Sequence, residues 1–183
     1  MGSVKIFTVT SLIEIIARDP HPKSFSFPSH TYTHEGRRIV VEEAKAAGSS
    51  HVFFLDSDMV VQGDVIQKLA AHNKAVVGAM YNERRHPLTS TVKVKKDGEL
   101  INFNTDNLPK HPFQCYATGT GCMLIDMQVF EKMEKPWFFF STFEDGRMDY
   151  GEDVWFCDRV QKAGFSVWCD PTIEIRHIGD YGF

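Results

Sequence analysis

Short apolar runs alternate with amphipathic segments along most of this chain. Unbroken apolar runs of this length predict buried strands, and they cover residues 52–55, 75–79 and 122–125. Apolar residues at helical spacing predict helices, and these cover residues 36–47, 65–72, 127–133 and 152–163. Because strands and helices follow one another in this order, the pattern predicts an α/β domain with a mostly parallel central sheet.

The remaining segments predict shorter elements around that sheet. Further strands are predicted over residues 4–9, 165–169 and 172–177. Two runs, 89–94 and 99–103, flank the dipeptide Asp97-Gly98 and predict a hairpin, which is a small antiparallel addition. The proline-containing segments 19–34 and 108–116 are predicted to be loops.

Length and charge restrict the function. A chain of 183 residues favours one domain over residues 1–183. The net charge of −4 argues against a nucleic-acid partner, because nucleic-acid binding needs a basic surface. No apolar run reaches the length of a transmembrane segment. The sequence leaves the oligomeric state open.

The spacing of the four cysteines indicates the redox state of the compartment in which the protein is expected. None belongs to a Cys-x-x-Cys pair, so a zinc ribbon is not expected. We favour free buried thiols in a reducing compartment, with two disulfides as the alternative. The four residues are Cys115, Cys122, Cys157 and Cys169. The expected location is the cytoplasm, or the host cytoplasm for a viral protein.

The strongest chemical signal is the sequence Asp56-Ser57-Asp58, which directly follows the apolar run 52–55. In open α/β sheets ligands bind outside the carboxyl ends of the strands. Two carboxylates at that place suit Mg²⁺ or Mn²⁺, with substrate phosphates completing the shell. The alternative is a solvated turn with a capping aspartate.

Two further segments carry candidate groups. Glu152 and Asp153 open the predicted helix 152–163, and Asp153 shares a face with its apolar core positions. Asp153 is therefore a candidate base that accepts a proton from a substrate hydroxyl, whereas Glu152 fits helix capping better. His177 ends a predicted strand, and an imidazole added to two carboxylates favours Mn²⁺ over Mg²⁺.

A glycine-containing turn and a mobile segment complete the candidates. Gly119 and Gly121 precede the strand 122–125 and allow a ligand to approach the backbone closely, although an ordinary turn has the same composition. The polar segment 141–151 joins two core elements, and we expect it to be a mobile lid that closes over substrate.

Together these segments resemble the GT-A glycosyltransferases, particularly their family 2-like branch. Four matching segments, covering roughly residues 35–179, carry the resemblance. They are Phe53-Phe-Leu-Asp-Ser-Asp58, Thr118-Gly-Thr-Gly-Cys-Met-Leu-Ile125, Glu152-Asp153 with Ala163-Gly-Phe165, and His177-Ile-Gly179. One feature departs from the family: 55 residues precede Asp56, which leaves room for one strand and a long loop where two strand–helix units are usual.

The resemblance implies a three-layer α/β/α fold and a metal-dependent transfer of sugar from a nucleotide-diphosphate donor, and we expect the transfer to be inverting. Asp58 and His177 would hold Mn²⁺ or Mg²⁺, with Asp56 on the metal or on the donor ribose. Arg37 or Arg38 would contact the phosphates through bidentate hydrogen bonds. The acceptor, a glycan, a protein or a lipid, is left open, as are the sugar and the nucleotide.

Two other functions are weighed against this one. A haloacid-dehalogenase-type phosphatase also has an apolar strand running into Asp-x-Asp, but its last motif should follow an apolar strand, and residues 146–150 do not form one. A catalytically silent module that binds nucleotide sugars or carbohydrates would keep the fold and use the aromatic run 137–140 for stacking. That run is equally well explained as core.

Overall fold

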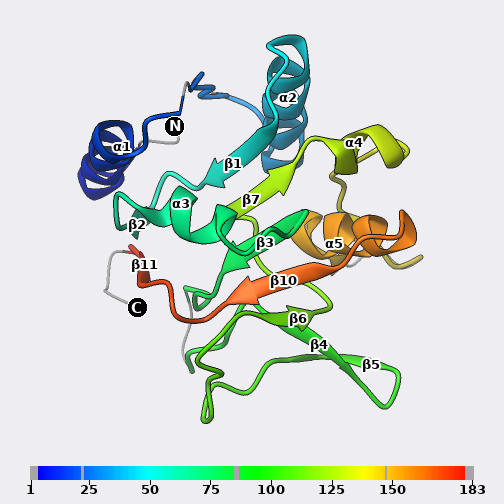
Figure 1. The fold of residues 1–183 in the computed structure, drawn as a ribbon. Coiled ribbons are helices and arrows are strands. Elements are labelled where there is room, and N and C mark those ends of the chain that lie inside the picture. Colours follow the sequence, from blue (N-terminus) through cyan, green and yellow to red (C-terminus); the bar gives the residue numbers. More distant parts are fainter. Residues whose placement is uncertain (1–3, 22, 85–86, 147, 180–183) are drawn as a thin grey trace.

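The computed structural model describes residues 4–21, 23–84, 87–146 and 148–179 (Figure 1). A five-stranded sheet lies at the centre, in the order β1-β7-β3-β10-β6. β3 pairs with β10 in parallel, and the other neighbours pair antiparallel, so β1, β3 and β10 share one direction. The strands are β1 (His51–Leu55), β3 (Val76–Ala79), β6 (Phe113–Cys115), β7 (Cys122–Asp126) and β10 (Val167–Asp170).

Helices cover both faces of this sheet, as Figure 1 shows. The helices on one face pack on Phe54, Met123 and Ile125; they are α2 (Thr33–Ala46), α4 (Gln128–Lys132) and α5 (Glu152–Lys162). The helices on the other face pack near Val77 and Leu124; they are α1 (Ile6–Arg18) and α3 (Val65–Ala70). Two separate apolar cores therefore enclose the sheet, which confirms the predicted three-layer α/β/α class.

Three small antiparallel sheets surround the central one. β2 and β11 pair with each other, β4 and β5 form the hairpin expected across Asp97-Gly98, and β8 pairs with β9. Both turn residues of that hairpin have positive φ, as an Asp-Gly turn requires. The strands are β2 (Met59–Val61), β4 (Lys93–Lys96), β5 (Glu99–Asn102), β8 (Ser141–Thr142), β9 (Met148–Tyr150) and β11 (Ile175–His177).

The first predicted element is wrong. Residues 4–9, expected to be a strand, belong mostly to helix α1. The alternation over six residues is too short to separate a strand from a helix, because the apolar positions continue at helical spacing to Ile16. In the described part of the predicted loop 19–34, no strand or helix occurs before Thr33, where α2 begins.

Other differences concern segment ends and short strands. The predicted loop 108–116 contains the edge strand β6. The segment 141–151, expected to be a mobile lid, forms the short hairpin β8–β9, and position 147 lies outside the described residues. All four cysteines are buried and free. Among the described residues no helix combines the length and the apolar character that crossing a membrane requires.

A buried carboxylate fixes the chain where it leaves β10. Asp170 is 3% exposed and accepts hydrogen bonds from the backbone N–H and the hydroxyl of Thr172, at 2.8 and 2.7 Å. Its other oxygen lies 2.7 Å from Nε2 of His72 on the chain that follows α3. Burial alone would raise the pKa of Asp170, but these hydrogen bonds hold it below the usual value.

We predict that Asp170→Asn destabilises the protein at neutral pH by about 1.5–3 kcal/mol, the range for hydrogen bonds to a charged group. Because the pKa of Asp170 is lower in the folded protein than in the unfolded chain, its ionised carboxylate stabilises the fold at pH values above the unfolded-state pKa. This contribution is lost as the pH falls through the folded-state pKa. Urea unfolding between about pH 7 and pH 3 should therefore show the variant converging on the wild type in acid. Asp106→Asn, which changes an exposed carboxylate, is the control; a gap that stays constant with pH would contradict the prediction.

Candidate active site

The candidate site lies at the edge where the parallel strands β1 and β3 end. Asp56 follows β1, and Tyr81 follows β3 by two residues. β7 runs the opposite way and begins at this edge, directly after Gly121. The backbone N–H of Asp56 donates to the carbonyl of Gly121 at 2.9 Å, so the acidic and glycine-containing segments, 65 residues apart in the chain, are neighbours here.

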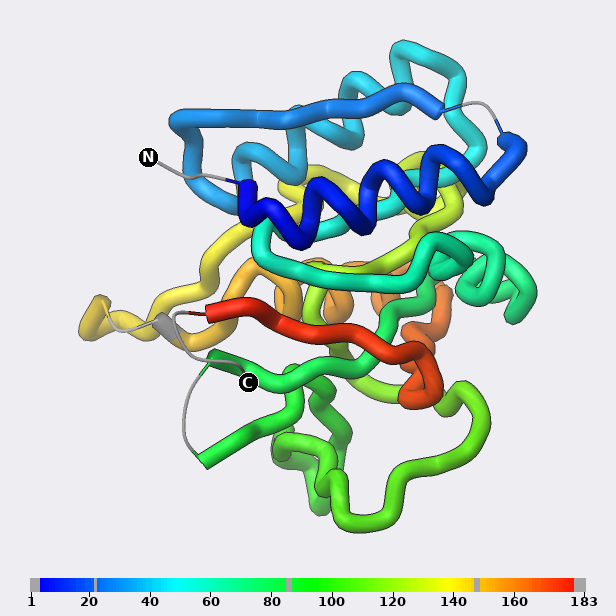
Figure 2. The backbone as a smooth tube through the Cα atoms, turned by 90° about the vertical axis from the view of Figure 1, so that its left-hand side faces the viewer, coloured from blue at the N-terminus to red at the C-terminus, as the bar shows by residue number. Residues whose placement is uncertain are grey.

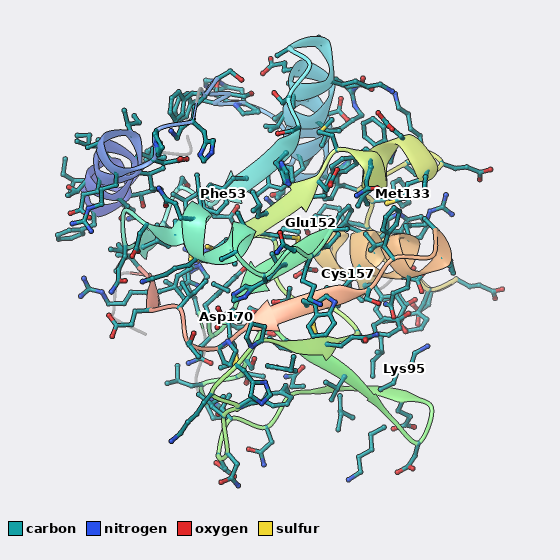
Figure 3. All side chains as sticks on the ribbon, viewed as in Figure 1. Phe53, Lys95, Met133, Glu152, Cys157 and Asp170 are labelled. Carbon is teal, nitrogen blue, oxygen red and sulfur yellow. The ribbon has the colours of Figure 1, made fainter. Side chains whose placement is uncertain are left out.

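A buried arginine joins three elements at this edge. The Arg37 side chain, from α2, is 8% exposed. One terminal nitrogen lies 3.1 Å from Oδ1 of Asp56, and Nε lies 3.4 Å from Oε1 of Glu152 at the start of α5. Figure 3 labels Glu152 near the middle of the molecule. Burial disfavours the charge, but the two carboxylates more than offset this and raise the pKa of Arg37, which stays protonated.

This network leaves Asp56 available to a ligand. Its side chain is 37% exposed, whereas those of Arg37 and Glu152 are 8% and 14% exposed. Arg37 contacts both carboxylate oxygens, at 3.1 and 3.4 Å, and the exposed part of the side chain is open for a polar group. The guanidinium also lies 5.3 Å from the centre of the Phe54 ring, so its position is fixed by packing as well as by charge.

Asp58 and His177 form a second charged group close by. Oδ1 of Asp58 lies 3.5 Å from Nε2 of His177, and both side chains are about 15% exposed or less. The backbone carbonyl of Asp58 accepts a hydrogen bond from the N–H of Ile178 at 2.8 Å. The antiparallel pairing of β2 with β11 therefore fixes both residues, although they lie far apart in the sequence.

The hydrogen bonds of His177 fix which ring nitrogen carries the proton. Nδ1 lies 3.0 Å from the carbonyl oxygen of Asn82, which can only accept, so Nδ1 is the donor. In neutral imidazole the lone pair of Nε2 then faces the carboxylate of Asp58. This arrangement needs a proton or a cation between the two groups, and a histidine whose other nitrogen donates to a backbone carbonyl is typical of metal ligands.

The residues present fit a cation that takes part of its shell from substrate. Asp58 and His177 offer one oxygen and one nitrogen, and among the described residues no group of three His, Cys, Asp or Glu side chains is placed to hold a metal. Asp56 therefore does not complete a three-residue site with them. Mg²⁺ commonly uses one or two carboxylates together with substrate phosphates, so two protein ligands are compatible with a nucleotide-bound metal.

Arg84 occupies part of the same carboxylate. One of its terminal nitrogens lies 2.8 Å from Oδ2 of Asp58, and its side chain is 49% exposed. Burial raises the pKa of Asp58 and lowers that of His177, but their mutual hydrogen bond and charge reverse both effects. Asp58 therefore ionises more readily than usual, and His177 holds its proton more tightly than usual.

Tyr81 connects the two charged groups. Its hydroxyl accepts a hydrogen bond from the N–H of Gly121 at 2.9 Å, and its ring meets that of His177 edge to face at 5.5 Å between centres. Burial and the nearby charge of Asp56 raise the pKa of Tyr81 well above its usual value. The phenol is therefore neutral and can donate its own proton to a ligand or a neighbouring carboxylate.

The two predicted glycines have no room for a side chain. A Cβ on Gly121 would lie 2.7 Å from the Tyr81 hydroxyl and 2.9 Å from Oδ2 of Asp56. A Cβ on Gly119 would lie 2.1 Å from the same hydroxyl. The sequence predicts that a ligand approaches the backbone at these glycines, but in the structure the Tyr81 side chain occupies that space. The two glycines therefore allow Tyr81 to lie near Asp56.

Asp153 lies at the start of α5, next to Glu152 and half-buried. Its Oδ1 accepts a hydrogen bond from the N–H of Val154 at 2.8 Å. Burial, followed by the charge of Glu152, raises its pKa above the usual value for an aspartate. Phe156, Cys157 and Val160 on the same helix face are fully buried, as predicted from their spacing.

The structure separates the two candidate arginines. Arg38 lies next to Arg37 in α2, but its guanidinium binds Glu35 at 2.5 Å and reaches Glu42 at 4.0 Å, both on the same helix. It therefore does not join the network around Asp56. Sequence reasoning missed Tyr81 and Arg84, although both follow β3, and the rule that ligands bind beyond the carboxyl ends of strands would have pointed to them.

Comparisons with known proteins identify the fold. No protein-family model and no curated protein matches this chain. The crystal structure of A197 from STIV is similar, with a TM-score of 0.67 and 20% identity over 98% of this chain and 82% of that one. GalNAc-T7, solved with UDP, GalNAc and Mn²⁺, has a TM-score of 0.55 and 13% identity; the match covers 97% of this chain and 36% of that one. The chain therefore has a GT-A-like fold, as its motifs predict.

The Arg37 network gives a direct stability test. We predict that Arg37→Met lowers the free energy of unfolding by about 3 kcal/mol, because it leaves two carboxylates close together without their shared cation. Arg38→Met is the matched control and should change stability by less than about 0.5 kcal/mol, since its ion pairs are exposed. Urea unfolding at neutral pH measures both, and equal effects of the two substitutions would contradict this account of the network.

Proposed function

We propose that the protein is a metal-dependent glycosyltransferase that moves a sugar from a nucleotide-diphosphate donor to an acceptor hydroxyl. The observation that carries the proposal is the Asp58–His177 pair at the strand edge of a GT-A-like fold, where Nδ1 of His177 donates to a backbone carbonyl and Nε2 faces the carboxylate, as in metal-ligating histidines. The presence of UDP and Mn²⁺ in the structure of GalNAc-T7 supports the choice of donor and metal. Residues 1–183 would act as one unit in the cytoplasm.

Asp58 and His177 would hold Mn²⁺ or Mg²⁺. When bound, the cation would neutralise negative charge on the departing diphosphate, which stabilises the transition state. Arg84 would add a second positive charge at the phosphates once the metal takes over its partner Asp58. We assign the phosphate contact expected of Arg37 or Arg38 to Arg84, because Arg37 is held by two carboxylates and Arg38 lies on the helix surface.

Asp56 would bind a hydroxyl of the donor, with the ribose as the expected group. Arg37 fixes the orientation of the carboxylate, while more than a third of the side chain stays open to solvent. Gly119 and Gly121 would contribute by letting Tyr81 pack against the backbone. The donor pocket would therefore be rigid on the side of the sheet, as precise positioning requires.

Asp153 would act as the general base in an inverting transfer. A carboxylate with a raised pKa is a better proton acceptor than an ordinary surface aspartate, and Asp153 has that property because it is half-buried beside Glu152. It would take the proton of the acceptor hydroxyl as that oxygen attacks the anomeric carbon. Glu152 would act indirectly, since its carboxylate is bound to Arg37.

Aromatic rings beside the start of α5 favour a glycan among the three acceptor classes. Phe139 is 47% exposed, and its ring lies 5.5 Å from that of Trp155, one helical turn beyond Glu152. On the other side it meets His34, one turn before Arg37 in α2. The exposed ring therefore adjoins the charged network along two helices, where it can stack on a sugar.

The alternatives make different predictions. In a phosphatase of the haloacid-dehalogenase type the first aspartate of Asp-x-Asp must attack phosphorus, whereas Asp56 is held here by Arg37. A phosphate analogue such as vanadate would then bind, and nucleotide sugars would not. A silent binding module would bind the donor and never turn it over. A thermal-shift screen of UDP-, GDP- and dTDP-sugars with Mn²⁺ separates the phosphatase from the other two, because native-state ligands raise the melting temperature.

The metal role is tested by nucleotide binding. We predict that Mn²⁺ tightens binding of the selected nucleoside diphosphate to the wild type, and that this gain is lost in Asp58→Ala and strongly reduced in His177→Ala. Calorimetry with and without Mn²⁺ measures the gain directly. Asp64→Ala is the control, since this aspartate pairs with Lys68 in α3, away from the site. A metal-dependent gain that survives in Asp58→Ala would refute the assignment.

The base is tested by kinetics. Asp153→Asn should lower kcat by roughly 10²–10⁴-fold while donor and metal binding are kept, because loss of a general base affects the chemical step. The base must be deprotonated, so the wild-type rate should fall as pH drops through the raised pKa of Asp153, and this acid limb should vanish in the variant. Asp149→Asn, in the adjacent strand β9, is the matched control. Loss of turnover in Asp149→Asn together with activity in Asp153→Asn would identify a different base.

A further inference from the structure

Both oxygens of the Asp58 carboxylate already face a basic side chain. Oδ2 lies 2.8 Å from a terminal nitrogen of Arg84, and Oδ1 lies 3.5 Å from Nε2 of His177. The side chain of Asp58 is 15% exposed, so water screens these charges only in part. A cation that uses Asp58 as a ligand therefore enters a site where a guanidinium already balances the charge of the carboxylate.

The two partners of Asp58 differ in how firmly they are held. His177 ends β11, and Figure 2 shows this red segment passing between β2 and the chain that follows β3. Its Nδ1 lies 3.0 Å from the carbonyl oxygen of Asn82, and its ring packs against that of Tyr81. The side chain of Arg84 is 49% exposed, and within the part of the chain that the structure describes Asp58 is its only ion-pair partner. Arg84 is therefore the partner that can leave the carboxylate.

The charge of Arg84 matters more than the strength of its ion pair. The pair itself contributes little free energy, because about half of the arginine side chain is in water. A guanidinium beside Asp58 nevertheless repels a divalent cation that approaches the same carboxylate. Water weakens this repulsion without removing it, because the side chains of Asp58 and His177 are largely shielded from solvent. Arg84 therefore opposes the binding of a cation on its own.

The carboxylates next to these residues in the chain are already paired. Asp56 is bound to Arg37 at 3.1 Å, and Glu83 lies 3.9 Å from the ammonium nitrogen of Lys93. A guanidinium displaced from Asp58 by a cation would therefore add to the positive charge at this edge of the sheet. A diphosphate removes that excess, because it carries several negative charges and its oxygens match the planar donor geometry of a guanidinium.

We propose that Arg84 couples the binding of the cation to the binding of the nucleotide: it opposes a cation at Asp58 while no diphosphate is present, and it binds the diphosphate when cation and nucleotide enter together. The inference rests on the proposed function, which supplies the nucleotide-diphosphate donor. Because coupling between two ligands is reciprocal, the diphosphate should tighten cation binding by the same factor as the cation tightens diphosphate binding. The cation would then be held firmly only together with a donor.

Binding of Mn²⁺ alone tests the opposing effect of Arg84. Arg84→Gln removes the charge and keeps a polar side chain, so it should bind Mn²⁺ on the order of 10-fold more tightly than the wild type. The matched control is Arg176→Gln, which removes an equal charge one residue before His177, where the side chain lines a groove beside α1. Its affinity should stay within about 2-fold of the wild type, since a more distant exposed charge is screened.

The measurement is a titration that follows the electron paramagnetic resonance signal of free Mn²⁺. It is made at about pH 8, where an ordinary imidazole is neutral, so that all three proteins are compared with the same state of a model histidine. Because the Arg84 side chain is half exposed, its substitution should leave the core intact. A variant that merely disturbed the fold would bind Mn²⁺ more weakly, which is the opposite of the expected change.

Nucleotide binding tests the coupling itself. Calorimetry with UDP, GDP or dTDP, whichever the thermal-shift screen selects, gives the factor by which Mn²⁺ tightens nucleotide binding in each protein. Arg84→Gln should reduce this factor on the order of 10-fold, because it lacks the charge that opposes the cation alone and binds the diphosphate afterwards. Arg84→Lys keeps the charge without the planar donor group, and it should recover a large part of the factor.

The outcomes separate this proposal from the proposed function. Mn²⁺ binding that is equal or weaker in Arg84→Gln than in the wild type would overturn the role of Arg84, and metal-dependent nucleotide binding by the wild type would then leave the proposed function standing. Tighter Mn²⁺ binding with an unchanged coupling factor would also overturn the coupling. A wild type that binds Mn²⁺ and none of the nucleoside diphosphates would refute the proposed function, and the coupling with it.

Discussion

The buried charge of Arg37 is the constraint on which the arrangement of the site depends. A guanidinium removed from water is strongly destabilising unless it is paired, and here its partners come from two other elements, Asp56 after β1 and Glu152 at the start of α5. α2 cannot shift along the sheet without breaking both ion pairs. The position of α5, and with it that of Asp153, is therefore tied to the end of β1 by charge as well as by apolar packing.

The second charged group is held by backbone pairing. β2 and β11 lie outside the central sheet, and their antiparallel register brings His177 opposite Met59, next to Asp58. The carbonyl of Asn82 then fixes the imidazole, so the chain after β3 contributes as well. Three segments that are distant in sequence thus determine one histidine tautomer. This degree of preorganisation is typical of sites where a ligand must meet a fixed lone pair.

The sequence alone predicts those elements whose own residues carry a clear apolar pattern. The unbroken apolar run at residues 52–55 predicts β1, and the amphipathic spacing after Gly151 predicts α5. The sequence therefore places Asp56 directly after a strand and Asp153 at the start of a helix. The pairing of β2 with β11 could not be predicted, because three-residue strands carry almost no periodic signal. The ion-pair partners of Arg37 could not be predicted either, because Arg37 and Arg38 are adjacent and share the same local sequence pattern. Only the fold directs Arg37 inward, whereas Arg38 pairs with Glu35.

Helix α1 shows why burial alone does not decide which face of an element turns inward. The acidic loop presents a carbonyl at Ser57, and the end of β2 presents an N–H at Val61, and both need partners in a partly buried place. Thr8 and Ser11 supply them, so the polar side of α1 faces the protein and the apolar side faces outward. Each residue of the loop is then tied to a different element: Asp56 to α2, Ser57 to α1 and Asp58 to β11. A ligand that binds this loop would therefore meet a turn whose three residues are held by three different elements. A change at one of these supports would reach the other two through the backbone between them and through Tyr81, which contacts both Gly121 and His177.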